Sequence, residues 1–166
     1  GKTLIDVGAG GGFPSIPLKI LSEDLSATLL EATGKKCEFL KTVVKELCLS
    51  NVEVINKRAE DLAKDVKFRE CFDHATARAV ARLNTLSEYS LPFVKIGGQF
   101  ISYKSGEIEE EVVASKSAVF LLGGKIKDTV KFELGESGRS FVIIDKTKGT
   151  PKTYPRKAGT PSKKPL

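Results

Sequence analysis

The residues best suited to bind a ligand lie in one short glycine-rich stretch near the start of the chain. Residues 6–13 read DVGAGGGF and complete a short apolar run. Glycine at such a turn adopts positive φ angles and lets the backbone come close to a ligand. The dinucleotide fingerprint G-x-G-x-x-G does not fit. A motif that begins at Gly8 would need its last glycine at Phe13, and one that begins at Gly10 would need it at Ser15. The spacing is D-x-G-x-G-x-G, with an acid two residues before the first glycine.

Residues for metal binding and nucleophilic catalysis are scarce. The chain has one histidine, His74, and three cysteines, Cys37, Cys48 and Cys71, at no metal-like spacing. We therefore predict no metal, and both a disulfide scaffold and a Ser-His-Asp triad are disfavoured. The absence of a signal peptide and of an apolar run near ~18 residues predicts a cytoplasmic protein with no membrane partner. His74 lies among apolar residues, so a packed histidine is favoured over a catalytic one.

The sequence around these residues alternates apolar strands with amphipathic helices. Strands are predicted over residues 3–7, 27–30, 52–55, 72–77 and 99–103, and helices over residues 13–21, 34–48, 83–91 and 107–121. A closing hairpin is predicted from residues 125–134 and 140–145, around a turn at 135–138. This order gives an α/β fold: a mostly parallel seven-stranded sheet with helices on both faces and an antiparallel edge hairpin. Ligands of such sheets bind beyond the carboxyl ends of the strands, where the glycine stretch lies.

The net charge of +6 is concentrated at the C-terminal end of the sequence. Residues 146–166 hold seven basic residues, no acid and four of the seven prolines, whereas the remaining 145 residues are close to neutral. We predict one folded domain over residues 1–146 and an extended, basic, proline-rich tail over residues 147–166. A basic tail on a neutral domain indicates a polyanionic partner such as nucleic acid, with a solubilising terminus as the alternative.

The glycine stretch resembles the cofactor loop of class I S-adenosylmethionine-dependent methyltransferases, which have a Rossmann-like fold. In that superfamily a carboxylate at the end of the second strand usually holds the ribose hydroxyls, and Glu31 lies there, 19 residues after Gly12. A carboxylate offers two acceptor oxygens to two donor hydroxyls. Taken alone, the glycines can form only a tight turn and Glu31 a solvated strand end. The resemblance implies S-adenosyl-L-methionine as the cofactor.

Four blocks in order make the resemblance more specific. They are residues 6–18 (DVGAGGGFPSIPL), 58–61 (RAED), 76–81 (TARAVA) and 154–161 (YPRKAGTP). Together they resemble the glucose-inhibited division protein B family of bacterial 16S rRNA guanine-N7 methyltransferases. The resemblance implies methylation at N7 of guanine 527 in the usual rRNA numbering, with the small ribosomal subunit as partner and a monomeric enzyme. Members of that family carry a helical segment before the first strand, so we expect this chain to be truncated or partial.

The resemblance also implies which residues bind the cofactor. They are Gly8, Gly10, Phe13, Glu31, Ala59, Glu60 and Arg78. Ala59 and Glu60 match the family's adenine-binding pair, and Arg78 lies at the methionine end. The alternatives are a core residue for Phe13, a first-turn helix charge for Glu60 and a structural ion pair for Arg78.

Candidate RNA contacts come from the fifth strand and from the tail. They are Lys104, Arg156, Lys157, Lys163 and Lys164. For Lys104 a solvated lysine is the alternative. The tail is expected to act as an electrostatic clamp on RNA, with little effect on cofactor affinity.

No catalytic side chain is predicted for the implied reaction. N7 of guanine carries a lone pair and no proton, so it can attack a sulfonium methyl without a general base. The end of the fourth strand has neither the cysteine of cytosine-C5 methylases nor the Asp/Asn-Pro-Pro-aromatic motif of exocyclic amino methylases. A non-catalytic RNA-binding or ribosome-assembly module on the same scaffold is the alternative function, and a small-molecule methyltransferase is a third.

Overall fold

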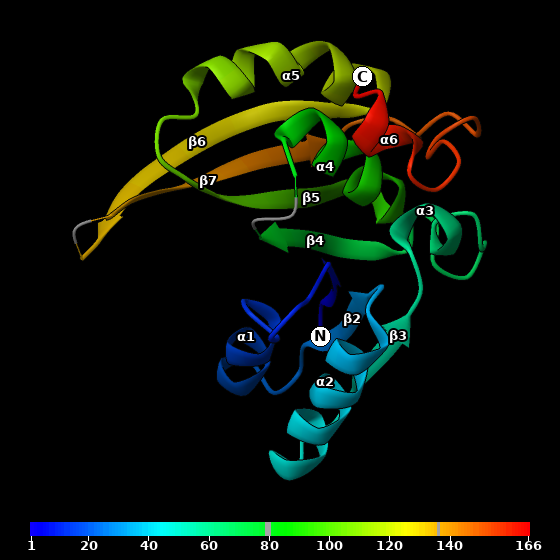
Figure 1. Cartoon of the computed structure of the whole chain (residues 1–166), viewed down its shortest axis with the longest axis vertical. Coiled ribbons are helices and arrows are strands. Elements are labelled where there is room, and N and C mark those ends of the chain that lie inside the picture. Colours follow the sequence, from blue (N-terminus) through cyan, green and yellow to red (C-terminus); the bar gives the residue numbers. More distant parts are fainter. Residues whose placement is uncertain (79–80, 136) are drawn as a thin grey trace.

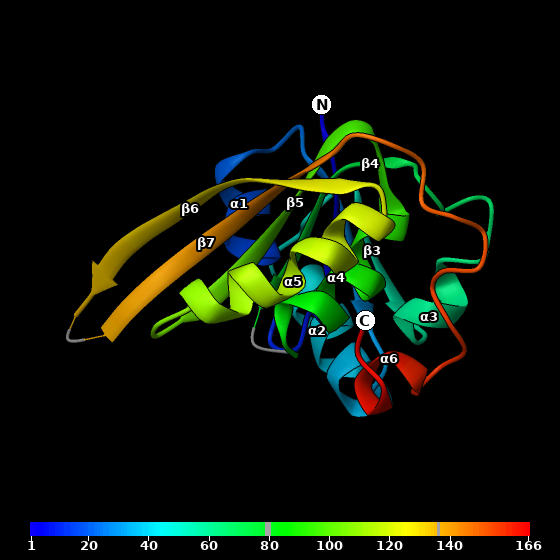
Figure 2. The ribbon, with the colours of Figure 1, turned by 90° about the horizontal axis from the view of Figure 1, so that it is seen from above.

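The computed structural model describes residues 1–78, 81–135 and 137–166, and its centre is a sheet of seven strands (Figure 1). The strands are β1 (Thr3–Val7), β2 (Ser26–Glu31), β3 (Val52–Asn56), β4 (Phe72–Arg78), β5 (Val94–Ser105), β6 (Gly124–Leu134) and β7 (Ser137–Lys146). Their order is β3-β2-β1-β4-β5-β7-β6, and β7 runs antiparallel to both of its neighbours, β5 and β6, whereas the other described pairs are parallel. The predicted parallel sheet with an edge hairpin is confirmed. Figure 2 shows this hairpin reaching beyond the other strands.

The helices follow the strands in the predicted alternation. They are α1 (Ser15–Leu21), α2 (Gly34–Glu46), α3 (Ala59–Leu62), α4 (Leu83–Ser90), the 3-10 helix η1 (Leu91–Phe93), α5 (Glu109–Leu121) and α6 (Thr160–Lys163). The four-residue helices α3 and α6 were not predicted, because an element this short has no hydrophobic period. Ala79 and Val80 of the fourth strand's motif, and Glu136 of the predicted hairpin turn, lie outside the described residues.

The fifth strand begins earlier than predicted, at Val94 instead of Gln99. Gly97 and Gly98 were expected to precede the strand but lie inside it. A Cβ at Gly98 would collide with the carbonyl oxygen of Asp73 on β4. Glycine therefore allows a close approach of two strands here, beside a register shift between Phe72 and His74.

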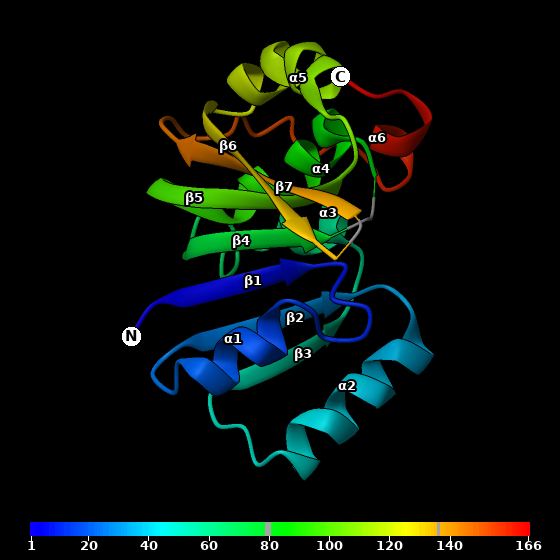
Figure 3. The ribbon, with the colours of Figure 1, turned by 90° about the vertical axis from the view of Figure 1, so that its left-hand side faces the viewer.

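Two apolar clusters lie on opposite faces of the sheet. Leu29 of β2 packs with Ile16 and Leu40, which places α1 and α2 on one face (Figure 3). On the other face, the larger cluster joins side chains of the sheet to α3, α4 and α5. The layers hold the carboxyl ends of β1, β2 and β4 at one rim of the sheet.

Residues 147–166 pack against α3 and α4, so the prediction that they are extended is wrong. The guanidinium of Arg69 donates to the carbonyls of Thr150 (2.8 Å) and Tyr154 (2.9 Å). Arg156 binds Glu88 of α4 through both guanidinium and backbone N–H groups. These partners lie 68 to 85 residues apart in the sequence, so no local sequence pattern predicts the contacts. The predicted domain boundary after residue 146 stays a prediction.

Candidate functional site

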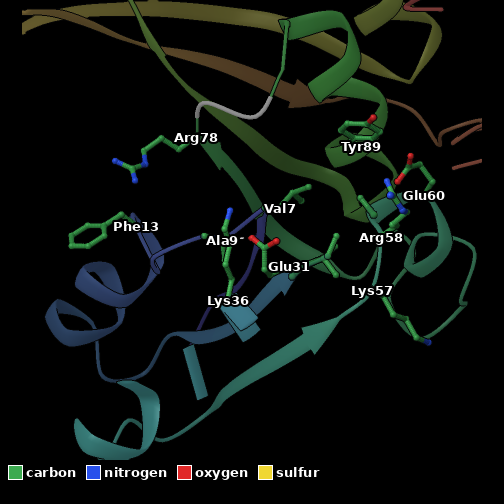
Figure 4. A pocket seen from close by; sticks show the side chains of 15 residues that line it. Val7, Ala9, Phe13, Glu31, Lys36, Lys57, Arg58, Glu60, Arg78 and Tyr89 are labelled. Carbon is green, nitrogen blue, oxygen red and sulfur yellow. Dashed lines mark hydrogen bonds between the residues drawn. The ribbon is translucent and has the colours of Figure 1, made fainter. Parts of the chain in front are cut away.

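The glycine stretch forms one wall of a cavity of about 410 Å³ at the carboxyl ends of the parallel strands (Figure 4). Gly8, Gly10 and Gly12 all have positive φ angles, of 76°, 56° and 88°. The N–H of Gly8 donates to the carbonyl of Leu30 (2.9 Å), which ties the loop to β2. At Gly12 an added Cβ would lie 2.5 Å from Ile16 Cδ1. The loop therefore needs glycine both for its dihedral angles and for its contact with α1.

Asp6, the acid of the glycine motif, is buried and connects the segments on either side of this loop through hydrogen bonds. Its Oδ2 accepts a hydrogen bond from Ser15 Oγ (2.8 Å), and its Oδ1 accepts one from Thr76 Oγ1 (3.2 Å). Burial raises the pKa of Asp6 to about 6, although these two hydrogen bonds oppose the rise. The carboxyl group thus joins β1, α1 and β4 and does not line the cavity.

Glu31 ends β2 and presents its carboxylate to the cavity. Oε2 accepts from the N–H of Gly10 (3.0 Å) and Oε1 from the N–H of Thr33 (2.9 Å). Burial raises the pKa of Glu31, but the backbone N–H groups of Thr33 and Gly10 outweigh it and hold that pKa below its usual value. The alternative of a solvated strand end is wrong, because Glu31 is only 6% exposed. Each carboxylate oxygen keeps a further lone pair for a hydroxyl donor.

The far end of the cavity is formed by the start of α3. Ala59 and Glu60 occupy its first turn, where backbone N–H groups have no intrahelical partner and can donate to a ligand. The Glu60 side chain is buried, and its Oε1 accepts a hydrogen bond from the N–H of Gly159 (2.9 Å). Tyr89 of α4 completes this end. The C-terminal segment thus contacts a residue of the cavity wall directly, which the sequence did not predict.

Phe13 and Arg78 form the opposite end of the cavity. The Arg78 guanidinium carbon lies 5.8 Å from the centre of the Phe13 ring, within the range of a cation–π contact. Phe13 is 54% exposed, so the alternative of a core residue is wrong. No ion pair of Arg78 is found within residues 1–78, 81–135 and 137–166.

The cavity therefore brings together every predicted cofactor residue. Its lining includes Gly8, Gly10, Phe13, Glu31, Ala59, Glu60 and Arg78. It also includes residues that the sequence analysis missed, namely Lys36, Lys57, Arg58 and Tyr89. No sequence pattern marks Tyr89, because its place in the cavity depends on how α4 packs on the sheet. That these residues bind the cofactor stays a prediction, to which their geometry is suited.

The predicted RNA contacts are not brought together. Lys104 Nζ donates to the carbonyl of Ala81 (2.8 Å) and to Glu111 Oε1 (2.6 Å), and its side chain is only 11% exposed. Lys104 is therefore not a solvated lysine. Arg156 is engaged by Glu88, with a distance of 2.6 Å between Nη2 and Oε2. Lys157, Lys163 and Lys164 are exposed on the C-terminal segment, and the RNA-binding role of all five stays a prediction.

Groups suited to other chemistry are absent from the described parts of the site. The cavity is not lined by His74, whose pKa is lowered by burial within β4. Across the three described ranges, no cluster of three or more His, Cys, Asp or Glu side chains is placed to hold a metal ion. No helix in these ranges is long and apolar enough to cross a lipid bilayer.

Comparison with known sequences identifies close relatives along the full chain. The profile of one family, described as "GidB: rRNA small subunit methyltransferase G", matches residues 1–141. A "Ribosomal RNA small subunit methyltransferase G" of Desulfitobacterium hafniense is 49% identical over 168 residues, covering 100% of this chain and 70% of the relative. The protein of that name from Clostridium perfringens (strain SM101) is 50% identical over 99% of this chain and 70% of its own length.

Comparison with solved structures supports the fold. The crystal structure of M. jannaschii TYW2 in complex with AdoMet matches with a TM-score of 0.70 and 18% identity, over 87% of this chain and 69% of that one. A 16S rRNA (adenine(1408)-N(1))-methyltransferase from Catenulisporales acidiphilia, solved with SAM, matches with a TM-score of 0.73 and 11% identity, over 89% and 86%. At these low identities the comparison shows a shared Rossmann-like fold and no more.

Proposed function

The chain belongs to the rRNA small subunit methyltransferase G family, and we propose that it methylates N7 of one guanine in 16S rRNA. The family's enzymes are S-adenosylmethionine-dependent methyltransferases of small-subunit rRNA. Guanine 527 is the position that the family resemblance favours. The observation that carries the proposal is that one cavity at the strand ends is lined by all seven cofactor residues predicted from the sequence. We further propose that the enzyme acts in the cytoplasm as a monomer and needs no metal.

The residues of the cavity fit the parts of S-adenosyl-L-methionine. The Glu31 carboxylate is ionised and can accept from both ribose hydroxyls. The first-turn N–H groups of α3 and the Glu60 carboxylate suit the edge of adenine. The glycine loop lets backbone approach the amino-acid part of the cofactor, and Arg78 can pair with its carboxylate bidentately.

The bound cofactor supplies a methyl group on a positively charged sulfur. The acceptor N7 has a lone pair and no proton, so its methylation releases no proton and needs no general base. The protein's contribution is then to hold the acceptor in line, an effect of up to about 7–11 kcal/mol in well-oriented systems.

The test is transfer of labelled methyl from S-adenosylmethionine to 16S rRNA, supplied naked and in 30S particles. We expect one labelled guanine, and borohydride–aniline cleavage of the product at that nucleotide, which marks N7 methylation. His74→Gln changes a residue that does not line the cavity, so this variant should keep the wild-type single-turnover rate. Binding of RNA and cofactor without any methyl transfer would favour the non-catalytic alternative. Label on another atom or base would contradict the proposed acceptor.

A further inference from the structure

The cavity proposed to bind S-adenosyl-L-methionine is called the cofactor pocket below. A second cavity, of about 850 Å³, lies beside it and shares Phe13 and Arg78 with it. One wall is the exposed apolar side of α1, and the other is formed by the outer strands of the sheet. The lining includes Pro17, Leu18, Leu21, Tyr103, Phe132 and Phe141. This volume falls within the range of about 300–1,000 Å³ found for ligand sites. The two cavities adjoin at these two residues, Phe13 and Arg78, at the end of the first cavity opposite α3.

Three side chains form a row that leads away from the cofactor pocket. Arg78 on β4 is the register partner of Tyr103 on β5, and Tyr103 is the partner of Phe141 on β7. Register partners in neighbouring strands project from the same face of a sheet. The ring centroids of Tyr103 and Phe141 lie 4.7 Å apart, as do those of Phe141 and Phe132. The row therefore continues Arg78 into a surface of three adjoining aromatic rings.

Cationic groups line the same cavity. Arg139 lies on β7 two residues before Phe141, and its register partner on β6 is Phe132. Lys104, which follows Tyr103, also lines the cavity, but its charge is matched by Glu111, another lining residue. Aromatic rings beside guanidinium groups are the means by which proteins bind single-stranded nucleic acid, because bases stack on the rings and cations meet phosphate. A purely apolar partner would leave the guanidinium charges of Arg78 and Arg139 unmatched.

We propose that this second cavity binds the acceptor guanosine and its neighbouring nucleotide as single-stranded RNA. Tyr103 and Phe141 provide stacking surfaces for the bases, and Arg139 contacts phosphate. The acceptor base enters from the aromatic row and reaches the cofactor beside Phe13 and Arg78. The assignment of these nucleotides as acceptor and neighbour rests on the proposed function, whereas the stacking surface follows from the geometry of the cavity itself.

The test uses a single-stranded RNA oligonucleotide with 2-aminopurine next to one 7-deazaguanine, which lacks N7 and cannot be methylated there. Binding to the 166-residue chain is followed by fluorescence in the presence of S-adenosylhomocysteine. Tyr103→Leu and Phe141→Leu should each weaken RNA affinity by about 5- to 150-fold and reduce the stacking signal. Tyr103→Phe should restore both. The matched control is Phe120→Leu, an exposed aromatic of α5 that lies outside the cavity.

The charge is tested with Arg139→Gln against Lys125→Gln, an exposed cation at the other end of the hairpin. Only the first should lower the slope of log K against log salt, by about 0.7 for one phosphate on a single strand. S-adenosylhomocysteine affinity should match wild type in every variant, which shows that each variant is folded and that its effect is confined to the RNA site.

Unchanged RNA affinity in Tyr103→Leu, Phe141→Leu and Arg139→Gln would overturn the proposal and leave the cavity to another occupant, such as a protein segment. Equal loss of RNA and cofactor affinity in Tyr103→Leu would also overturn it, because the effect would then act through the cofactor pocket. The two proposals fail separately. Stacking that depends on Tyr103, in a protein that transfers no methyl to natural RNA, would refute the enzymatic function and retain the RNA site.

Discussion

The ion pair between Glu88 and Arg156 is the contact whose loss should show that the C-terminal segment supports the cofactor pocket. The Glu88 side chain is fully buried, whereas that of Arg156 is 26% exposed. Arg156 Nε lies 2.9 Å from Oε1, Nη2 lies 2.6 Å from Oε2, and the backbone N–H of Arg156 also donates to Oε1 at 2.8 Å. We expect Glu88→Gln to release this segment from α4.

The expected cost follows from the geometry of the pair. Breaking a buried ion pair by removing one partner costs about 3–5 kcal/mol, and the partial exposure of Arg156 favours the lower end, about 3 kcal/mol. For a chain of this size, this corresponds to a fall in melting temperature of about 6–12 °C. Arg156→Gln should compensate in part, so the double variant should lose less stability than the two single variants together.

Cofactor affinity should fall in the same variant. Gly159, three residues beyond Arg156, donates its N–H to the Glu60 carboxylate at 2.9 Å in the wall of the pocket. This hydrogen bond to a charged group contributes about 1.5 kcal/mol to holding the Glu60 carboxylate in place, so its loss should lower cofactor affinity by at most about tenfold. This expectation replaces the one drawn from the sequence, in which the tail left cofactor binding unchanged.

The assay combines thermal unfolding with calorimetric titration of S-adenosylhomocysteine. Lys157→Gln is the matched control, because it removes an exposed charge from the same segment without touching Glu88. If Glu88→Gln and Lys157→Gln give the same melting temperature and cofactor affinity, the reasoning is wrong and the segment is energetically independent of the pocket.

Three further predictions concern the glycine loop and its supports. Glu31→Ala should weaken S-adenosylhomocysteine binding by about 1.5–3 kcal/mol in calorimetry, since it removes a charged acceptor, while Glu53→Ala on the exposed side of β3 should not. Above pH 6, Asp6→Asn should gain up to about 3 kcal/mol of stability relative to its difference from wild type below pH 4; at every pH the single amide oxygen can accept from only one of Ser15 and Thr76. Because the folded pKa of Asp6 is raised, wild-type stability falls as pH rises from about 4 to about 6, so the gain should vanish below pH 4 in urea unfolding. Gly12→Ala should lower the melting temperature and weaken cofactor binding, since its φ is 88° and its Cβ would meet Ile16; stability and binding equal to wild type would contradict the loop geometry.

The sequence by itself determined the fold and the meeting of the predicted cofactor residues at one rim of the sheet, because both depend on local patterns. Period-two and period-3.6 runs of apolar residues define most strands and helices, and their alternation fixes a parallel sheet. The glycine spacing and Glu31 lie directly at the ends of β1 and β2, which are adjacent strands. Residues that follow parallel strands meet at one rim, so their meeting in one cavity could be predicted.

Only the tertiary structure decided the fate of the C-terminal segment and of the outer strands. Composition marks residues 147–166 as basic and proline-rich, but their packing depends on Glu88 and Arg69, far away in the sequence. The same limit applies to Lys104, which reads as a solvated charge and is instead paired with Glu111. The row of Arg78, Tyr103 and Phe141 depends on the register of three neighbouring strands, which the sequence pattern did not predict. Such contacts need the whole fold, because a side chain's partners are set by which strands and helices become neighbours.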